Sequence, residues 1–404
     1  MNKNLSIFLR TLSIAVQLAY VKSYTHYLTV GELGYAYYLT ALSYAINALI
    51  LVPADYYQQA QFTAYYDKMF PLGSVISLNK KLLLLSAALT VILGIPVWIA
   101  GKISPLDLLL IYGLAVFLYL STSARNYLNN RGHNLFTGWI LLLEAFLKVA
   151  SFILFIVFGM SHISAFVLST VTAYLLEVLG LGIFFFLRVP FTSAATGDFD
   201  FKPMLTTSTA VSFSAFCNWL QLQSYRIFYV WLGFPEIAGL YTAVSNIGTM
   251  GMNASSTVFS QMLQPRLYSS DGGYIFQYFK YALLLCLAVF LGYLGFGNIL
   301  LYVLTKKGFE PYAKLMAFGI IVEGGNLLIG AASAYFTIRH RPFSLLGANI
   351  AGVLTAGLGI SLCLLLRPRN YYLLGVVLAC SQVVVCSILF YKAKKDISSE
   401  THSL

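Results

Sequence analysis

The sequence predicts an all-α polytopic membrane protein with about twelve transmembrane helices in two six-helix lobes. Of the 404 residues, 59% are hydrophobic and only 10% are charged, whereas soluble proteins carry about 25% charged residues. Apolar runs of roughly 20 residues, the length needed to cross a bilayer as a helix, recur from end to end. Two stretches about half a chain apart also share one residue pattern, which indicates an internal repeat.

The repeat relates residues 8–35 to residues 212–241. A shift of 204 residues, with one further residue for the last pair, aligns Gln17 with Gln221, Lys22 with Arg226, Glu32 with Glu236, and Gly34 with Gly239. Because an even number of helices separates the two stretches, both lobes should have the same orientation. We therefore expect a pseudo-two-fold axis along the membrane normal and a central cavity between the lobes.

The apolar runs define the expected helices and domains. The helices are predicted at about 6–29, 34–61, 82–101, 104–127, 134–159, 162–187, 205–232, 236–263, 274–304, 310–338, 343–366 and 371–391. Residues 1–190 form the predicted N-terminal lobe, and residues 205–404 form the C-terminal lobe with a short cytoplasmic tail. The Gly- and Asp-containing stretch 191–204 is the predicted cytoplasmic linker.

Lysine and arginine positions predict the orientation. Of the 25 such residues, sixteen fall on the side of the N-terminus, six fall on the other side, and three lie within helices. Because cytoplasmic loops are enriched in Lys and Arg, we expect both termini in the cytoplasm. The net charge of +11 is explained by this bias and is not evidence for nucleic-acid binding.

Polar stripes run along several predicted helices and carry most of the candidate site residues. Asp55 lies on the helix near 34–61, Asn253 on the helix near 236–263, and Glu323 on the helix near 310–338. Small and hydrogen-bonding residues also serve to pack helices together in membranes. Three stripes in one chain, two of them with a carboxylate, favour a hydrated central cavity.

Three carboxylates in apolar runs are candidates for ion coupling. Glu323 precedes two glycines that weaken its helix and is the first candidate for a proton or sodium site. Asp55 follows Pro53, which bends a helix. Glu144 is four residues from Lys148, so the two share a helix face and can form an ion pair, either structural or functional.

Lys22 and Arg226 occupy the same place in the two repeats. A cation at this depth usually faces the protein interior or a watery cavity, although a long side chain near a helix end can also reach the head groups. Gln223 shares a helix face with Arg226, which favours an inward position for that arginine.

The sequence has no motif for nucleotide binding, metal binding or covalent catalysis. There is no GxxxxGK[ST] motif for nucleotide phosphates, and the five histidines lack the spacing of a metal site. No Ser-His-Asp constellation can be argued. We therefore expect a transporter rather than an enzyme, with no cofactor or metal and with H+ or Na+ as candidate coupling ions.

The two turns at 29–35 (TVGELGY) and 235–241 (PEIAGLY), within twelve helices in two halves, resemble the polysaccharide-transporter branch of the MOP exporter superfamily, and within it the Wzx-type O-antigen flippases. The resemblance implies a flippase in the bacterial cytoplasmic (inner) membrane that moves undecaprenyl-diphosphate-linked oligosaccharide to the periplasmic face. Membrane lipids and other surface-polysaccharide assembly proteins would be its partners. Relatives often carry an Asp-Arg pair where this chain has Tyr225-Arg226.

An anionic diphosphate suits a cavity that contains cations, and arginine binds phosphate oxygens with two parallel hydrogen bonds. The predicted substrate-binding residues are Arg226, Lys22, Lys148, Gln223 and Asn253. The alternative is a MATE-like ion-coupled exporter of small molecules, which has the same architecture. A membrane-embedded polysaccharide polymerase or acyltransferase is a further alternative, but the predicted periplasmic loops are short for an enzyme of that kind.

Overall fold

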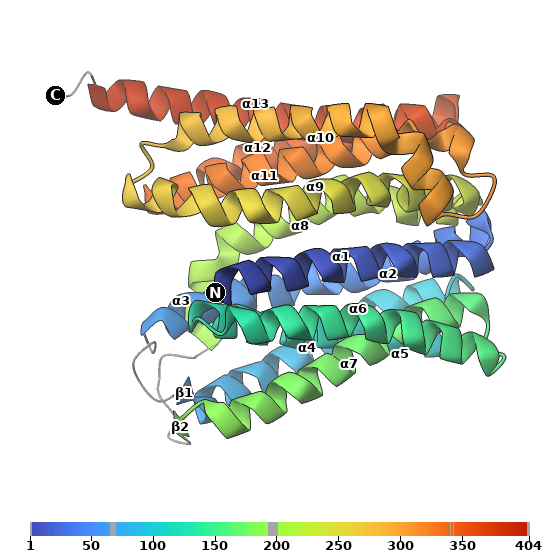
Figure 1. Cartoon of the computed structure of the whole chain (residues 1–404), viewed down its shortest axis with the longest axis horizontal. Helices are drawn as coiled ribbons and strands as arrows, with labels where there is room; N and C mark the ends of the chain where they lie inside the picture. The colour runs from blue at the N-terminus through green and yellow to red at the C-terminus, as the bar shows by residue number, and fades with distance from the viewer. Residues whose placement is uncertain (1, 65–69, 193–200, 340, 342, 402–404) are drawn as a thin grey trace. The chain divides into compact units, whose positions relative to one another are not determined.

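The computed structural model describes residues 2–64, 70–192, 201–339, 341 and 343–401, and helices account for most of them (Figure 1). The helices are α1 (Asn2–Tyr27), α2 (Val30–Ile46), the π-helical turn η1 (Asn47–Leu51), α3 (Val52–Ala64), α4 (Leu72–Ile99), α5 (Pro105–Asn130), α6 (Asn134–Val157), α7 (His162–Arg188), α8 (Phe201–Trp231), α9 (Pro235–Ser269), α10 (Ile275–Leu304), the 3-10 turn η3 (Glu310–Tyr312), α11 (Leu315–Ile338), α12 (Ser344–Leu366) and α13 (Tyr371–Thr401). Strands β1 (Phe70–Pro71) and β2 (Phe191–Thr192) pair in parallel. Because α2, η1 and α3 follow one another as one interrupted helix, the prediction of an all-α chain with about twelve long helices is confirmed.

The chain divides into two compact units. The first unit contains Met1–Leu28 and Tyr35–Phe216, and the second contains Thr29–Gly34 and Cys217–Leu404. In the first unit α6 packs against α1 and α7, and α5 also packs against α7. In the second unit α11 packs against α9, α10 and α13, and α12 packs against α13. The predicted linker 191–204 falls largely on residues 193–200, outside the described residues.

Helices α4 and α13 extend furthest beyond their predicted bounds. Helix α4 begins at Leu72, ten residues before the expected start at 82, and α13 continues to Thr401 rather than ending near 391. Both extensions contain polar residues such as Lys80 and Lys394. A helix keeps its backbone hydrogen bonds after it leaves the hydrocarbon, so polar residues end the apolar run without ending the helix.

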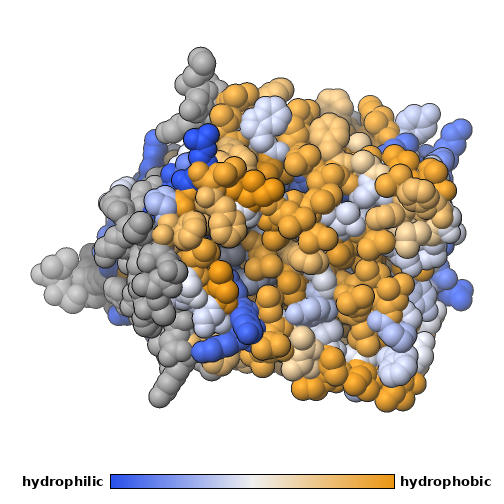
Figure 2. Space-filling view, turned by 90° about the horizontal axis from the view of Figure 1, so that it is seen from below, coloured by the Kyte–Doolittle hydropathy of each residue, from blue (hydrophilic) through white to orange (hydrophobic). Residues whose placement is uncertain are grey.

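Within the described residues, nine helices are long and apolar enough to span a bilayer. Helices α1, α8 and α9 are long but are not among these nine. Polar residues such as Gln17, Gln221 and Asn246 interrupt their apolar runs. In Figure 2 the middle of the visible face is mainly hydrophobic, and most strongly hydrophilic residues lie towards its two ends. This is the pattern expected for a chain with lipid around its helices.

The π-helical turn η1 sits in the middle of the second long helix. It lies just before Pro53, which has no N–H to donate. The side-chain amide of Asn47 in this turn donates a hydrogen bond to the carbonyl of Ala115 on α5 (3.2 Å). Single π-helical turns occur frequently at functional sites. This turn directs the chain into α3, which carries Asp55.

The turn before α2 contacts the start of α9 through the backbone. A Cβ atom on Gly34 would lie 2.0 Å from the carbonyl oxygen of Pro235, and one on Gly239 would lie 2.0 Å from the carbonyl oxygen of Val30. One shift of 205 residues relates Val30 to Pro235 and Gly34 to Gly239, so the repeat generates both halves of the contact. Only glycine permits backbones to approach this closely.

This contact predicts the effect of adding one methyl group. Replacing Gly34 or Gly239 with alanine should lower the free energy of unfolding by about 1–3 kcal/mol, the usual cost of overpacking. Gly31→Ala is the matched control, because its Cβ would lie 3.8 Å from the Glu236 side chain, an ordinary contact. The measurement is the thermal midpoint of the purified protein in detergent. Equal midpoints for all three variants would contradict the close backbone contact.

Candidate functional site

A buried cluster of charged side chains joins three helices of the first unit. Nη1 of Arg125 on α5 donates to Glu144 on α6 (2.7 Å) and to Glu177 on α7 (2.9 Å). Nζ of Lys148 on α6 contacts the other oxygen of Glu144 (2.5 Å) and donates to the hydroxyl of Tyr174 on α7 (3.2 Å). The predicted pairing of Glu144 with Lys148 is therefore confirmed.

These two cations and two carboxylates balance one another in charge. Their side chains are 1–14% exposed, so each charge has lost most of its water and depends on its partners. Arg125 shares one guanidinium between two carboxylates on different helices. The arrangement holds α5, α6 and α7 together and also places four titratable groups inside the unit.

Asp55 on α3 forms a second polar centre of the first unit. Its Oδ2 accepts hydrogen bonds from the amides of Gln59 (2.7 Å) and Asn126 on α5 (3.2 Å). No salt bridge to Asp55 occurs within the described residues. Its hydrogen-bond partners are thus neutral amides rather than cations. This environment differs from that of Glu144, which contacts two cations.

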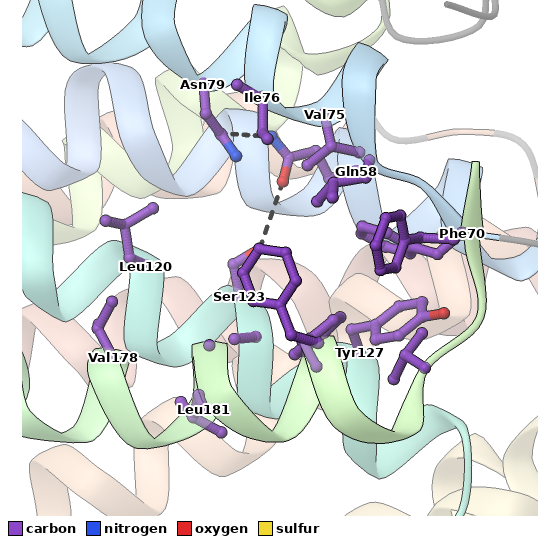
Figure 3. A pocket seen from close by; sticks show the side chains of 17 residues that line it. Gln58, Phe70, Val75, Ile76, Asn79, Leu120, Ser123, Tyr127, Val178 and Leu181 are labelled. Carbon is purple, nitrogen blue, oxygen red and sulfur yellow. Dashed lines mark hydrogen bonds between the residues drawn. The ribbon is translucent and has the colours of Figure 1, made fainter. Parts of the chain in front are cut away.

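Next to Asp55, a set of neutral polar side chains joins α3, α4 and α5. The amide nitrogen of Gln58 donates to Asn79 (2.9 Å) and to the hydroxyl of Tyr119 (2.9 Å). Tyr119 also donates to Asn79 (2.6 Å), and Ser123 donates to the side-chain carbonyl oxygen of Gln58 (3.4 Å). Figure 3 shows Gln58, Asn79 and Ser123 together at one side of a cavity (Figure 3).

Arg226 lies inside the second unit, where its exposed fraction is 6%. Its Nε donates to the hydroxyl of Tyr225 (3.2 Å), and its guanidinium carbon lies 5.6 Å from the centre of the Tyr225 ring. The Tyr225 hydroxyl also bonds to Thr242 on α9 (2.6 Å). Tyr225 is thus a neutral hydrogen-bond partner of this arginine.

Further polar residues of the second unit lie on α8, α11 and α13. The Glu323 carboxylate on α11 accepts a hydrogen bond from the amide of Asn326 (3.0 Å). Gln221 on α8 donates to Ser381 on α13 (3.0 Å). The neighbouring Gln382 is 1% exposed, and within the described residues neither of its side-chain polar atoms has a hydrogen-bond partner. Burial of an amide without partners is costly.

The remaining predicted site residues are distributed over both units. Lys22 on α1 is half-buried in the first unit. Gln223 is half-buried in the second unit, and its Oε1 has no hydrogen-bond partner in the described part of the chain. Asn253 on α9 is exposed, and its Oδ1 accepts a bond from Thr257 (3.4 Å). The substrate-binding set that these residues form with Arg226 and Lys148 stays a prediction.

Sequence reasoning missed part of this arrangement. By its position in the sequence, at the end of an apolar run, Arg125 falls among the sixteen Lys and Arg residues on the side of the N-terminus. In the structure its side chain is only 14% exposed. Its position five residues before the end of α5, inside the helix rather than in the following loop, is the one local signal that it could face the protein interior. The contacts of Gln58, Asn79 and Tyr119 have no sequence signal, since three different helices supply them.

No group of three or more His, Cys, Asp or Glu side chains in the part of the chain that the structure describes could hold a metal ion. The geometry instead offers carboxylates, amides and cations inside helical units. Such groups can exchange a proton or coordinate a monovalent cation within a membrane.

The chain is similar to solved structures, although not to known sequences. No family model matches the chain, and no curated protein matches it. The structure of the MATE multidrug transporter DinF-BH has a TM-score of 0.68 at 16% identity, covering 98% of this chain and 95% of that one. A multidrug resistance MATE family transporter of the MOP superfamily also matches, in its inward-facing conformation (TM-score 0.59, 14% identity, 97% and 95% coverage) and its outward-facing conformation (0.56, 13%, 98% and 96%).

The likeness extends over essentially the whole chain in each case, and the identities are low, so it establishes the fold rather than the substrate. With the nine apolar spans found among the described residues, it shows that the chain is a multi-pass membrane protein with the fold of the MATE transporters.

Because the charges of this cluster are buried and paired, neutralising one of them should lower the stability of the protein strongly. Glu144→Gln would leave Arg125 and Lys148 with one carboxylate between them, and breaking a buried pair costs about 3–5 kcal/mol. Asp107→Asn is the control, because Asp107 is half-buried at the start of α5 and takes part in its cap rather than in an ion pair with these groups. Thermal unfolding in detergent should show a much lower midpoint for Glu144→Gln than for the control. Similar midpoints would mean that the cluster contributes little to stability.

Proposed function

We propose that this protein is a secondary transporter that works by alternating access. The observation that carries the proposal is the full-length similarity to MATE transporters solved in both inward-facing and outward-facing conformations. The internal repeat of Lys22 with Arg226 and of Gly34 with Gly239 supports it, because paired repeats are a common basis of alternating access. We expect the protein in the bacterial cytoplasmic membrane with both termini in the cytoplasm.

An ion gradient is the proposed energy source, and Asp55 and Glu323 are the proposed coupling residues. A coupling carboxylate has to gain and lose an ion during the cycle. Glu144 contacts two cations at 2.5 and 2.7 Å, so its charge is matched by fixed groups of the protein. Asp55 and Glu323 accept hydrogen bonds from neutral amides, and an amide partner can stay in place when the carboxylate is protonated or binds a cation.

The proposed substrate is an oligosaccharide linked to undecaprenyl diphosphate. Two features support it: the resemblance of the turns at 29–35 and 235–241 to polysaccharide transporters, and the burial of Arg226 beside the Tyr225 hydroxyl. Tyr225 is neutral where polysaccharide transporters often carry an aspartate, so this neighbour adds no negative charge beside the arginine. Arginine also matches the geometry of phosphate oxygens.

Export of small molecules by a MATE-like mechanism is the second candidate function. Structural similarity supports it more directly than it supports the flippase, because the matched proteins are described as multidrug transporters. The two functions differ in substrate, and they share the fold and the proposed ion coupling.

If Asp55 and Glu323 couple transport to an ion gradient, replacing each carboxylate with its neutral amide should reduce transport and leave the fold intact. Asp55→Asn and Glu323→Gln should each lower ion-driven transport at least about ten-fold, because neither amide can take up a proton or supply the negative charge that balances a bound cation. Both replacements keep the size of the side chain. The measurement is the ion-driven uptake of the transported substrate into proteoliposomes, with Asp107→Asn as the control. Near wild-type rates in both variants would exclude these carboxylates as coupling groups.

If Arg226 binds the diphosphate of the proposed substrate, replacing it should change transport. Arg226→Ala should stop surface display of the polysaccharide and cause lipid-linked units to accumulate at the cytoplasmic face. Arg226→Lys should retain part of the activity because the charge survives and the paired hydrogen bonds do not. Arg367→Ala, at an exposed arginine that ends α12, is the control.

The same strains separate the two candidate functions. Loss of the whole protein should leave drug sensitivity unchanged if the substrate is a lipid-linked oligosaccharide. Increased drug sensitivity with normal surface polysaccharide would support small-molecule export instead. Full display by Arg226→Ala at normal protein abundance would exclude a substrate-binding role for this arginine.

A further inference from the structure

Glu177 on α7 is less well compensated than Glu144, the other carboxylate of the buried charged cluster. Its side chain is 1% exposed, and its Oε1 contacts Nη1 of Arg125 (2.9 Å). Within the described residues its Oε2 has no hydrogen-bond partner. Glu144, in contrast, has Arg125 at one oxygen (2.7 Å) and Lys148 at the other (2.5 Å). A buried carboxylate with an unpartnered oxygen is costly as an anion, and a proton at that oxygen lowers the cost.

A second buried polar atom without a partner lies next to Glu177. Ser121 on α5 is fully buried, and its Oγ has no hydrogen-bond partner among the described residues. The serine side chain lies beside the Glu177 carboxylate, although the two are not in hydrogen-bond geometry. A hydroxyl can both donate and accept a hydrogen bond. After a small rotation, Ser121 can therefore donate to the ionised carboxylate or accept from the protonated acid.

The charged side chains that face Glu177 come from the two helices that pack against α7. In the described part of the chain they are Arg125 on α5 and Glu144 and Lys148 on α6. On α7 itself, the hydroxyl of Tyr174 accepts a hydrogen bond from Lys148 (3.2 Å). The four charges cancel when both carboxylates are ionised, and a proton on Glu177 leaves one net positive charge. The side chains of Arg125 and Lys148 are 14% and 12% exposed, so the cluster reaches the protein surface at its cations.

The ion pair between Arg125 and Glu177 joins α5 to α7. Within the described residues, no other salt bridge connects these two helices. The same nitrogen of Arg125 also donates to Glu144 on α6. When Glu177 is neutral, the guanidinium loses a charge-assisted partner, and hydrogen bonds between charged groups are the stronger kind. Protonation of Glu177 therefore weakens the link between α5 and α7 and leaves the link between α5 and α6 in place.

We propose that Glu177 binds and releases a proton at Oε2, with Ser121 as its positioning residue, and that its charge controls the link between α5 and α7. Glu177 differs from Asp55 and Glu323, whose partners are neutral amides, because its proton competes with Arg125, a cation of the protein. A link between helices that depends on one proton can join ion uptake to helix movement. That use of the proton rests on the proposed function, whereas the binding of the proton does not.

Infrared difference spectroscopy of the purified protein detects the proton without a transported substrate. The background protein carries Asp55→Asn and Glu323→Gln, so these two carboxylates do not contribute. Lowering the pH from about 9 to about 6, where exposed carboxylates stay ionised, should produce the C=O stretching band of a carboxylic acid. Adding Glu177→Gln should remove this band, and adding Asp107→Asn should leave it unchanged. No band in the background protein, or a band that survives Glu177→Gln, would overturn the proposal.

Variants of Ser121 test its position beside the proton. Ser121→Ala should move the C=O band to higher frequency, because the acid loses a hydrogen-bond partner, and Ser121→Thr should restore the frequency because it keeps the hydroxyl. Ser123→Ala on the same helix is the matched control, since Ser123 donates to Gln58 (3.4 Å). An unchanged frequency in Ser121→Ala, or the same shift in Ser123→Ala, would contradict the assignment of Ser121 as the partner.

Hydrogen exchange measured by mass spectrometry tests the link between α5 and α7. At one alkaline pH, Glu177→Gln should speed amide exchange in the part of α7 that follows residue 177 at least about three-fold relative to the wild type, because weaker contacts increase local opening. Asp107→Asn should exchange at the wild-type rate. Equal exchange in Glu177→Gln and the wild type would refute control of the link by this charge. Failure of the transport predictions with both results in place would leave this proposal standing and count against the proposed function alone.

Discussion

The backbone contact between the start of α2 and the start of α9 is the constraint on which the chain's organisation depends. Gly34 and Gly239 each face a carbonyl oxygen of the other segment at a distance that no side chain could occupy. Thr29–Gly34 therefore belongs to the second unit, although the chain before and after it belongs to the first. Thr29 and Glu32 fix this turn with reciprocal hydrogen bonds that cap α2 (2.7 and 3.2 Å).

The buried charges of the first unit fall into two environments with different consequences. The cluster around Arg125 pairs each cation with a carboxylate, and its ion pairs connect three helices. Asp55 accepts hydrogen bonds from amides and lies two residues after Pro53 and four after the end of the π-helical interruption η1. Fixed ion pairs suit a structural role, because replacing one partner leaves a buried charge unmatched. A carboxylate among neutral donors suits reversible binding of a cation.

The charged cluster contains one contact that the sequence predicts and others that it does not. The spacing of Glu144 and Lys148 predicted their ion pair, because residues four apart share a helix face. The count of Lys and Arg residues placed Arg125, near the end of the helix predicted at about 104–127, on the cytoplasmic side, because a cation at the end of an apolar run usually marks the membrane boundary. The partners that bury Arg125 are Glu144 and Glu177, which lie 19 and 52 residues away on other helices. Local spacing carries no information about such contacts.

The sequence by itself determined the all-helical membrane fold, the repeat and the alignment of Gly34 with Gly239, because apolar run length and residue identity are local properties. Tertiary structure decided which polar residues meet. It brought Gln58, Asn79 and Tyr119 together from three helices, and it formed an aromatic-lined cavity beside them. The physical reason is that a helix satisfies its own backbone, so the sequence specifies where helices form, whereas side-chain partners depend on how those helices pack.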